Sequence, residues 1–505
     1  MWSLIKAQKR PLIFLSALVI FCYANSLNNE FISDDIFAIR DNPAIKSQAY
    51  FLDNRLFSLR PLELFLIHKF FGPNPAFFRL PNILAHIGAV CFAYLTLQGL
   101  YGRAAAFFAA AIFACHPVMA EAVTWISGGA YAHYSFLFLA SFYFYLRAGA
   151  RRRAYFLSLA FFILALLFTE RAAVFIFIFL VWELVNRTLG RNWKRLLPFF
   201  VLGGGWLLFY ILRIKVQQGI LASQYCAETG TENIFYQVPI AIYSYLELLF
   251  WPADLTLYHS ELSFMLPEYI FRLAIFIVFM LFIVWGYWHN PKVFFWLSLF
   301  LIALSPTLTP FRISWVVAER YVYLGALGVF TLVGLGLARL AGHKKYRRAV
   351  YAGFGVILLV LSARTICRNI DWKNQDNLWF STGRHSPSCP TTHNNLGDVW
   401  TRRGDLNKAA EEFQLAIKLK PNYADAYHNL ANTYWAMGRI DEAIAGYQEA
   451  LEFNPNIWQA YQRLAIIHYN LGNRGLAEQY LRAAINIDPK NEELRSNLSA
   501  ISPSK

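Results

Sequence analysis

Two adjacent carboxylates, Asp34 and Asp35, are the residues of this sequence best suited to chemistry. They lie in the stretch FISDDIFAIRDNP, just after the first long apolar run. A carboxylate at a membrane surface can accept a proton from a hydroxyl nucleophile, and a second carboxylate can tune the first or help to hold a divalent metal ion. Adjacent acids also occur in solvated loops and at helix N-termini, which leaves a structural role open. We take both as candidate catalytic residues and as candidate ligands of a divalent ion.

Further charged residues fall at the ends of other apolar runs, in the segments SLRPLELF, HPVMAEAV, LLFTERAAV and VVAERYVYL. A charge at the centre of a membrane span costs about 2.5 to 3.5 kcal/mol, and less near an interface. Snorkelling and structural ion pairs are the alternative explanations. Several such charges on one predicted side favour a shared polar cavity there, and arginines suit a lipid-linked phosphate. The candidate donor-binding and phosphate-binding residues are Arg60, Glu121, Glu170, Arg171 and Arg320.

The composition divides the chain into two parts. Only 15% of the 505 residues are charged and 57% are hydrophobic, whereas about 25% charged residues are usual in soluble proteins. Residues 1–367 contain 31 basic and 16 acidic side chains, and residues 368–505 contain 15 of each. The net charge of +15 therefore lies in the apolar part. Since its Lys and Arg clusters sit between apolar runs and no RNA-binding motif accompanies them, we attribute the charge to membrane topology and predict no nucleic-acid partner.

Twelve apolar runs are candidate membrane spans, for which about 20 residues are needed. They lie near residues 11–27, 78–100, 104–120, 131–148, 154–169, 172–187, 197–213, 235–252, 270–288, 293–310, 321–340 and 348–366. Basic clusters at 151–153, 187–195 and 343–348 mark the cytoplasmic side when the N-terminus is inside. All three agree only with an odd number of spans. We therefore predict about eleven, and we expect the run 235–252 to lie in the interface or to re-enter.

The C-terminal part contains an internal repeat of 34 residues. This spacing separates Pro387, Pro421, Pro455 and Pro489, and also Gly404, Gly438 and Gly472, Leu396, Leu430 and Leu464, and Ala416, Ala450 and Ala484. It is the tetratricopeptide period, in which each unit is a helical hairpin. We predict three full repeats, about 388–489, and a closing helix. The fold class is then all-α, with a membrane domain at 1–367, a linker and lead-in helix at 368–387 and a tetratricopeptide-repeat α-solenoid at 388–505.

The first helices of these repeats carry a set of polar and aromatic residues. Repeat superhelices present a concave face suited to extended peptides. The candidate acceptor-binding residues on that face are Tyr427, Asn429, Asn432, Tyr434, Tyr461 and Arg463. We therefore predict that the repeats bind a protein or peptide, with a purely structural prop as the alternative.

Other kinds of chemistry lack the residues that they need. No second His or Cys stands at zinc spacing from His116, so we predict no zinc site. The sequence has no Walker A loop, no GxGxxG before a helix and no GxSxG elbow, which disfavours soluble nucleotide chemistry. Of the six cysteines, only Cys226 and Cys389 fall in segments predicted to lie outside the cytoplasm, where a disulfide between them is conceivable.

The order of these motifs resembles the transmembrane and tetratricopeptide-repeat O-mannosyltransferases and their bacterial relatives, within the GT-C superfamily of glycosyltransferases. The resemblance covers nearly the whole chain: the acidic pair, RPL followed by PNILAH, HPVMAEAV, TERAAV, AERYVYL, the Asp371-Trp372 lead-in and then the repeats. Single motifs are weak, but their order is specific. Relatives commonly have Lys-Glu where this chain has Thr169-Glu170 followed by Arg171, which puts the phosphate contact there in doubt.

The resemblance implies an inverting transfer of a sugar from a polyprenyl-phosphate donor to an acceptor hydroxyl, here expected to be Ser or Thr of a protein, on the extracytoplasmic face. Asp34 and Asp35 match the family's acidic pair, and Glu121, Glu170 and Arg320 match later polar positions that would shape the donor cavity. We predict a multi-pass protein of the bacterial inner membrane, with a cytoplasmic N-terminus and periplasmic repeats. Mannose is not assumed, and the acceptor could also be a lipid or a glycan.

Two other classes of function are weighed against this enzyme. The first is a non-enzymatic, membrane-anchored scaffold that assembles envelope proteins through its repeats. The second is a transporter, since intramembrane charges often mark pathways. We rank the transporter last, because the charges gather at one face and no inverted repeat is apparent.

Overall fold

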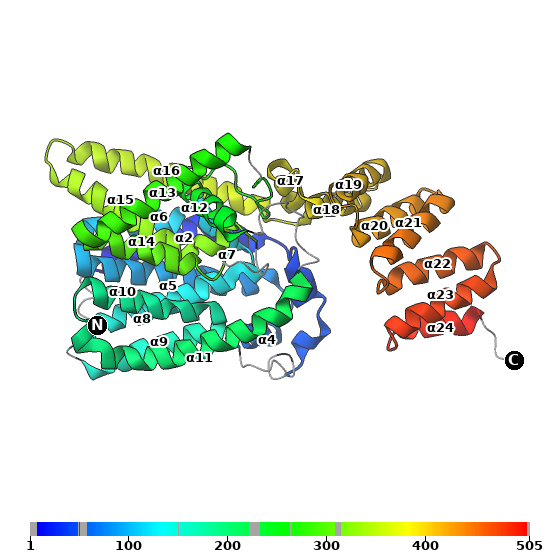
Figure 1. Ribbon diagram of the computed structural model, residues 1–505, viewed down its shortest axis with the longest axis horizontal. Coiled ribbons are helices and arrows are strands. Elements are labelled where there is room, and N and C mark those ends of the chain that lie inside the picture. The colour runs from blue at the N-terminus through cyan, green and yellow to red at the C-terminus, as the bar shows by residue number, and fades with distance from the viewer. Residues whose placement is uncertain are drawn as a thin grey trace. The chain divides into compact units, whose positions relative to one another are not determined.

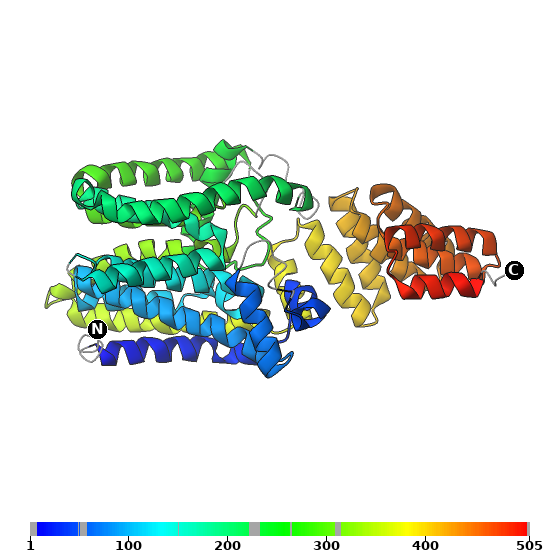
Figure 2. The same ribbon diagram turned by 90° about the horizontal axis from the view of Figure 1, so that it is seen from below.

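The computed structural model describes residues 8–48, 50, 58–149, 151–221, 233–262, 265–308 and 315–501, and it contains helices and no strand in these ranges. The chain divides into two compact units (Figures 1 and 2). Unit 1 comprises Met1–Ser223 and Thr229–Leu378, and unit 2 comprises Gln224–Glu228 and Trp379–Lys505. The predicted all-α class is confirmed, while the predicted division into three regions stays a prediction.

Unit 1 is a bundle of mostly apolar helices, drawn from blue to yellow-green in Figure 1. They are α2 (Lys9–Tyr23), α4 (Leu59–Phe71), α5 (Pro75–Tyr101), α6 (Arg103–Cys115), α7 (Ala120–Thr124), α8 (Ala130–Tyr145), α9 (Arg152–Phe168), α10 (Ile176–Val185), α11 (Leu189–Leu221), α12 (Ile234–Phe250), α13 (Leu266–His289), α14 (Pro291–Leu304), α15 (Tyr323–Gly342) and α16 (Arg347–Asp371). The next helix, α17 (Gln375–His385), continues from unit 1 into unit 2.

Five helical segments of the described chain are long and apolar enough to cross a membrane. They are Lys9–Asn28, Pro75–Tyr101, Leu266–His289, Glu319–Gly342 and Arg347–Asp371. A sixth is counted if Arg103–Cys115 and Pro117–Thr124, which meet at 54°, form one bent span. This count follows from length and composition alone, so the predicted total of about eleven spans stays a prediction.

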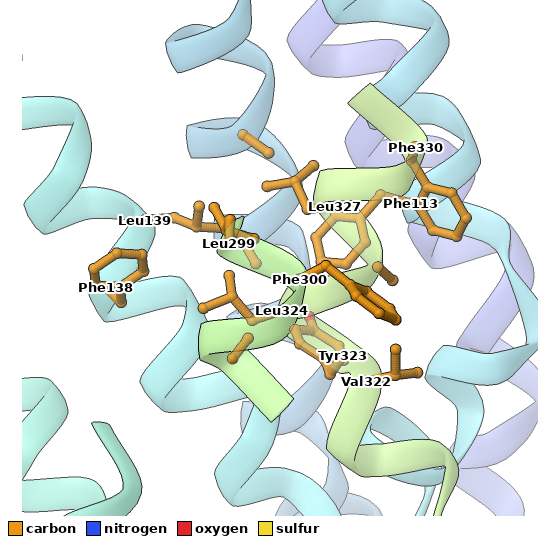
Figure 3. Close-up of a cluster of buried hydrophobic side chains, with 14 of the residues drawn as sticks. Phe113, Phe138, Leu139, Leu299, Phe300, Val322, Tyr323, Leu324, Leu327 and Phe330 are labelled. Carbon is orange, nitrogen blue, oxygen red and sulfur yellow. The ribbon is translucent and has the colours of Figure 1, made fainter. Parts of the chain in front are cut away.

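The core of unit 1 lies where α6, α8, α14 and α15 meet. Figure 3 shows its buried side chains, among them Phe113, Phe138, Leu139, Leu299, Phe300, Tyr323, Leu324, Leu327 and Phe330. Two glycines of α15 permit this packing. A Cβ on Gly328 would lie 2.2 Å from the carbonyl oxygen of Trp296, and one on Gly334 would lie 2.7 Å from that of Ala105. Since no Cβ approaches an oxygen so closely, α15 needs glycine at both positions.

The chain bends directly after α6, at His116 and Pro117. Proline has no N–H, and it disfavours helical backbone at the residue before it, so α6 ends at Cys115 and a new short helix begins. His116 is buried; its Nδ1 accepts the Val118 N–H at 3.3 Å, and its Nε2 lies 3.1 Å from the Leu249 carbonyl oxygen. His116 therefore has a structural role in the bend, which points the following residues 117–129 toward the acidic loop.

Unit 2 consists of helical hairpins, drawn in olive, orange and red in Figure 1. They are α18 (Pro390–Arg402) with α19 (Leu406–Leu419), α20 (Ala424–Ala436) with α21 (Ile440–Phe453), and α22 (Trp458–Asn470) with α23 (Arg474–Ile487), followed by α24 (Glu492–Ile501). The turn glycines Gly404, Gly438 and Gly472 have φ of +79°, +77° and +83°, a left-handed conformation that favours glycine. The predicted three hairpins and closing helix are confirmed.

Of the two cysteines of the conceivable disulfide, Cys226 and Cys389, the structure describes only Cys389. Cys389, at the start of α18, is disulfide-bonded, and Cys22, Cys91, Cys115 and Cys367 are free. Cys226 lies outside the described residues.

Candidate active site

Asp34 and Asp35 lie in the loop after α2, and their side chains have different surroundings. Ser33, just before them, has φ of +50°, which is uncommon for a residue other than glycine. Asp34 is exposed, whereas Asp35 is fully buried. Protein atoms that crowd the carboxyl of Asp34 raise its pKa, and the positive charge of Arg320 partly offsets this. The backbone thus gives two residues that look equivalent in the sequence different surroundings. The carboxyl of Asp34 is open, and that of Asp35 is enclosed.

Asp35 is held by Ser127. Its Oδ1 accepts hydrogen bonds from the Ser127 backbone N–H at 2.9 Å and from the Ser127 hydroxyl at 2.5 Å. Its Oδ2 is buried and has no hydrogen-bond partner in the described part of the chain. Burial raises the pKa of Asp35 to about 6, although the two hydrogen bonds from Ser127 and the positive charge of Arg79 each act to lower it. Asp35 therefore joins the acidic loop to residues 124–129, and its catalytic role stays a prediction.

Residues 124–129, which carry Ser127, are fixed by side chains from three helices. Each of these side chains contacts a backbone carbonyl oxygen. The pairs are Arg79 Nε with Thr124 (2.6 Å), Asn82 Nδ2 with Trp125 (3.1 Å), Arg60 Nη2 with Ile126, and His133 Nδ1 with Gly129 (2.8 Å). A segment outside regular helix would otherwise leave these carbonyl groups buried without partners, which is costly. The segment is consequently a rigid support for Asp35.

Arg60, a predicted phosphate ligand, is already engaged. It donates to Glu63 at 2.6 Å as well as to the carbonyl of Ile126. The other oxygen of Glu63 lies 3.0 Å from His133 Nε2. Although burial raises the pKa of Glu63, Arg60 and His133 lower it to about 2. In this geometry Arg60 supports the backbone at Ile126, and its role as a phosphate ligand stays a prediction. Glu63, from the same SLRPLELF segment, and His133 join it, although neither was a predicted site residue.

The acidic loop is also tied to the end of α16, through Asn369. This buried side chain donates from Nδ2 to the carbonyl of Cys22 and to Asn25 Oδ1, both at 2.8 Å. Its Oδ1 accepts the hydroxyl of Thr124 at 2.6 Å, and its backbone oxygen accepts from Asn29 at 2.9 Å. Asn369 therefore joins the end of α2, the 124–129 segment and α16 at one point.

Glu121 and Arg320, two predicted site residues, form a pair. Glu121 is fully buried; its Oε2 accepts the backbone N–H of Arg320 at 2.7 Å, and its Oε1 pairs with the guanidinium. The guanidinium also lies over the rings of Trp125 and Tyr321, 5.4 and 4.8 Å from their centroids. A buried carboxylate is thereby neutralised and hydrogen-bonded, as burial of a charge requires.

A second buried pair lies next to the first. Arg368 donates to Glu319 at 2.8 Å and to Asp371 at 3.1 Å, and its guanidinium lies 5.4 Å from the ring centroid of Trp372. Trp372 in turn stacks on Trp125, with centroids 5.7 Å apart. Arg368 was not among the predicted site residues, because in the sequence it looks like an ordinary basic residue at the end of a span.

Arg171 differs from the other arginines of this region. Its guanidinium lies over the rings of Tyr131 and Tyr321, at 5.4 and 5.7 Å. Within the described ranges it makes no hydrogen bond or ion pair to an acid, and neither does the side chain of its neighbour Glu170. Since Tyr321 also contacts Arg320, the two guanidinium groups lie on one ring. Arg171 is thus a cation that contacts two aromatic rings and has no acid partner in the described part of the chain.

Among the residues that the structure describes, the acidic pair does not form a metal site with other side chains. No group of three or more His, Cys, Asp or Glu side chains suited to a metal occurs among the described residues. One oxygen of Asp35 is occupied by Ser127, and the other is buried. The arrangement does not fit the several oxygen ligands that a divalent cation prefers, and we derive no step through a metal.

The predicted acceptor-binding residues of unit 2 contact neighbouring helices. The contacts are Asn429 with Asn394 (3.1 Å), Asn432 with the hydroxyl of Tyr447 (2.7 Å), Tyr434 with Gln414 (2.9 Å), Arg463 over Trp435 (4.7 Å), Tyr427 on Phe453 (5.5 Å) and Tyr461 near Tyr480 (6.3 Å). These side chains therefore help to join the repeats, and their role in binding an acceptor stays a prediction.

The fold and the buried charges define an integral membrane protein with a helical repeat domain. Residues 62–212 match the family of dolichyl-phosphate-mannose-protein mannosyltransferases. Residues 397–438, 424–457 and 459–491 match models of tetratricopeptide repeats. The first match covers α4 to α11, and it includes Glu121, Glu170 and Arg171.

Several animal proteins are similar over most of the chain. Human protein O-mannosyl-transferase TMTC3 is 24% identical over 82% of this chain, and protein O-mannosyl-transferase F38B6.6 of Caenorhabditis elegans is 26% identical over 82%. Protein O-mannosyl-transferase Tmtc2 of Drosophila melanogaster is 35% identical over 23% of the chain. The chain is thus similar in sequence to these O-mannosyl-transferases. It spans 52%, 63% and 12% of their lengths, respectively.

One solved structure resembles most of the chain. It is ArnT from Cupriavidus metallidurans bound to undecaprenyl phosphate, which is 14% identical with a TM-score of 0.41 and covers 90% of this chain and 81% of that one.

Proposed function

We propose that this protein is a membrane glycosyltransferase of GT-C type that moves a sugar from a polyprenyl-phosphate donor to an acceptor hydroxyl, on Ser or Thr of a protein. The observation that carries the proposal is the separation of the acidic pair: Asp34 is exposed, and Asp35 is enclosed by Ser127. The similarity to O-mannosyl-transferases supports the same class of reaction.

Asp34 is the proposed base. Its carboxylate accepts the proton of the acceptor hydroxyl while that oxygen bonds to the anomeric carbon of the sugar. A raised pKa makes a carboxylate a better proton acceptor. Because the acceptor oxygen attacks opposite the leaving group, the configuration at the anomeric carbon inverts.

Arg171 is the proposed phosphate ligand. The bond that breaks joins the anomeric carbon to a phosphate oxygen, and its electron pair leaves with the polyprenyl phosphate. A guanidinium that lacks an acid partner can stabilise this negative charge. Arg320 is paired with Glu121, so it contributes its field to Asp34 and shapes the cavity with Glu121 and Tyr321.

The repeats of unit 2 are proposed to bind the protein acceptor, with the acidic loop and the repeats both outside the cytoplasm. We place the protein in a bacterial inner membrane. Recruitment by the repeats would raise the local concentration of acceptor at Asp34 without any added chemistry.

The test is a transfer assay with the purified full chain in detergent. Polyprenyl phosphates carrying mannose, glucose or galactose are supplied with an extract of envelope proteins, and released polyprenyl phosphate is measured. Release by the wild type and not by Asp34→Asn supports the proposal and names the sugar. Equal release by both proteins overturns Asp34 as the base. No release from folded wild type with any donor overturns the enzyme and favours the scaffold.

A further inference from the structure

A pocket lies at the opposite end of α2 from the acidic loop. Its volume is about 280 Å³, and it is lined by Pro11, Tyr94, Arg103, Ala104, Phe107 and Tyr351. These residues come from α2, α5, α6 and α16, which pack against one another. Figures 1 and 2 show the start of α2 and the turn between α15 and α16 at the same end of unit 1.

Three of the six residues that line the pocket are aromatic, namely Tyr94, Phe107 and Tyr351. The ring of Phe107 lies 5.5 Å from that of Phe14 and 6.3 Å from that of Phe354. The hydroxyl of Tyr94 donates to Gln8 at 2.9 Å, so its oxygen is left free to accept. Arg103 is the one charged residue among those that line the pocket.

Arg103 has no acid near it to balance its charge. The sequence contains no Asp or Glu in residues 1–29, 64–120 or 321–370, which include all of α2, α5 and α6 and all but the last residue of α16. In the described part of the chain, its guanidinium makes no hydrogen bond or ion pair. The exposed residues Lys9, Arg10, Arg347 and Arg348, which also lie at the starts of α2 and α16, add further positive charge. Arg103 is exposed at the mouth of the pocket, so its guanidinium is available to an anionic group from another molecule.

We propose that this pocket binds the phosphate headgroup of an anionic phospholipid, with Arg103 as its ligand. A guanidinium can grip a phosphate with two parallel hydrogen bonds, and basic pockets between membrane helices are suited to anionic headgroups. The pocket is large enough for a headgroup and too small for two acyl chains. The chains would lie along the exposed apolar side chains of the neighbouring helices, such as Ile13 and Phe14 of α2 and Tyr351 of α16. This lipid is a structural ligand and is separate from the proposed donor site.

The test compares lipids on the purified, delipidated full chain by native mass spectrometry. We expect phosphatidylglycerol to bind and phosphatidylcholine, whose choline cation cancels the phosphate charge, to bind at least about fivefold more weakly, as expected for the loss of one surface charge interaction. Inorganic phosphate should also bind at least about fivefold more weakly, because it has no acyl chains to contact the apolar helices. Arg103→Gln should weaken phosphatidylglycerol about fivefold, and Arg103→Lys should restore part of the affinity. Arg348→Gln, an exposed basic residue at the same end that does not line the pocket, is the matched control and should change it less than about twofold.

An equal loss from both Gln variants would show general surface attraction and overturn the proposal. Binding of inorganic phosphate as tight as that of the lipid would overturn the lipid assignment. A second measurement does not depend on the folding of these variants: a photo-crosslinking phenylalanine analogue is placed at Tyr351 or, as control, at the exposed Tyr346. Labelled phosphatidylglycerol should be captured from position 351, and equal capture from both positions would contradict the site.

Discussion

Ser127 donates both its backbone N–H and its hydroxyl to one oxygen of Asp35, at 2.9 and 2.5 Å. These residues are 92 positions apart in the sequence. The contact fixes Asp35 inside the protein, and Asp34, the next residue along the chain, is left on the outside. The proposed chemistry at Asp34 therefore depends on Ser127, which takes no part in the reaction itself.

The free energy of unfolding should depend on pH because the carboxyl of Asp35 is enclosed. Its pKa of about 6 in the folded state lies above the usual value, so the folded protein holds this proton more tightly than the unfolded chain does. The free energy of unfolding should therefore fall as the pH rises from about 4 to about 6, by at most about 3 kcal/mol. Asp35→Asn should remove this part of the pH dependence. Thermal unfolding of both proteins in detergent between pH 4 and 7 measures the difference, and identical slopes would contradict the account.

Removal of the Ser127 hydroxyl should destabilise the acidic loop. Ser127→Ala deletes a hydrogen bond to a buried carboxyl, which costs about 1.5 to 3 kcal/mol. The matched control is Ser135→Ala. The hydroxyl of Ser135 is buried and has no hydrogen-bond partner in the described chain, so its loss should be neutral or stabilising. Denaturation midpoints of the two variants provide the comparison, and equal effects would show that the Asp35 contact carries no special weight.

The pair of Glu121 and Arg320 should behave as a unit. Arg320→Gln leaves Glu121 buried without its counter-charge, and loss of one partner of a buried pair costs about 3 to 5 kcal/mol. In the double variant with Glu121→Gln no charge is left uncompensated, so its stability should lie closer to that of the wild type. A double-mutant cycle from unfolding midpoints tests this, and strictly additive effects would argue against the pairing.

Arg171 should affect donor binding and leave the fold intact. Arg171→Gln removes a cation that has no acid partner among the described residues but lies over two aromatic rings, so the free energy of unfolding should fall by only about 1 kcal/mol. The KM for the polyprenyl-phosphate donor should rise about 10-fold or more, the equivalent of one lost charge-assisted hydrogen bond. Arg60→Gln is the contrast: it should lower stability, because Arg60 supports the backbone at Ile126. A donor KM unchanged by Arg171→Gln would refute the assignment.

The parts of this molecule that follow from local patterns were predictable from the sequence. The spacing of 34 residues fixes the turns at Gly404, Gly438 and Gly472, because each repeat folds mainly on itself and its neighbours. Asp34 and Asp35 stand out because they are two adjacent carboxylates just after an apolar run, in a part of the chain with few acidic residues.

The supporting contacts were not predictable, because they join distant segments. Thr124 and Asn369 are 245 residues apart, and Glu63 and His133 are 70 apart. Nothing local distinguishes these side chains from ordinary polar residues. For the same reason Arg60 and Arg171 looked alike in the sequence, although one is fully engaged and the other is not.

The most direct test of the central claim is the rate of sugar transfer by Asp34→Asn under single-turnover conditions, with Asp35→Asn beside it. Loss of a general base should slow transfer by about 10²- to 10⁴-fold while donor binding is retained. Asp35→Asn should be slowed far less, since an Asn oxygen can still accept from Ser127. Wild-type transfer by Asp34→Asn, or a larger loss in Asp35→Asn than in Asp34→Asn, would contradict the assignment of Asp34 as the base.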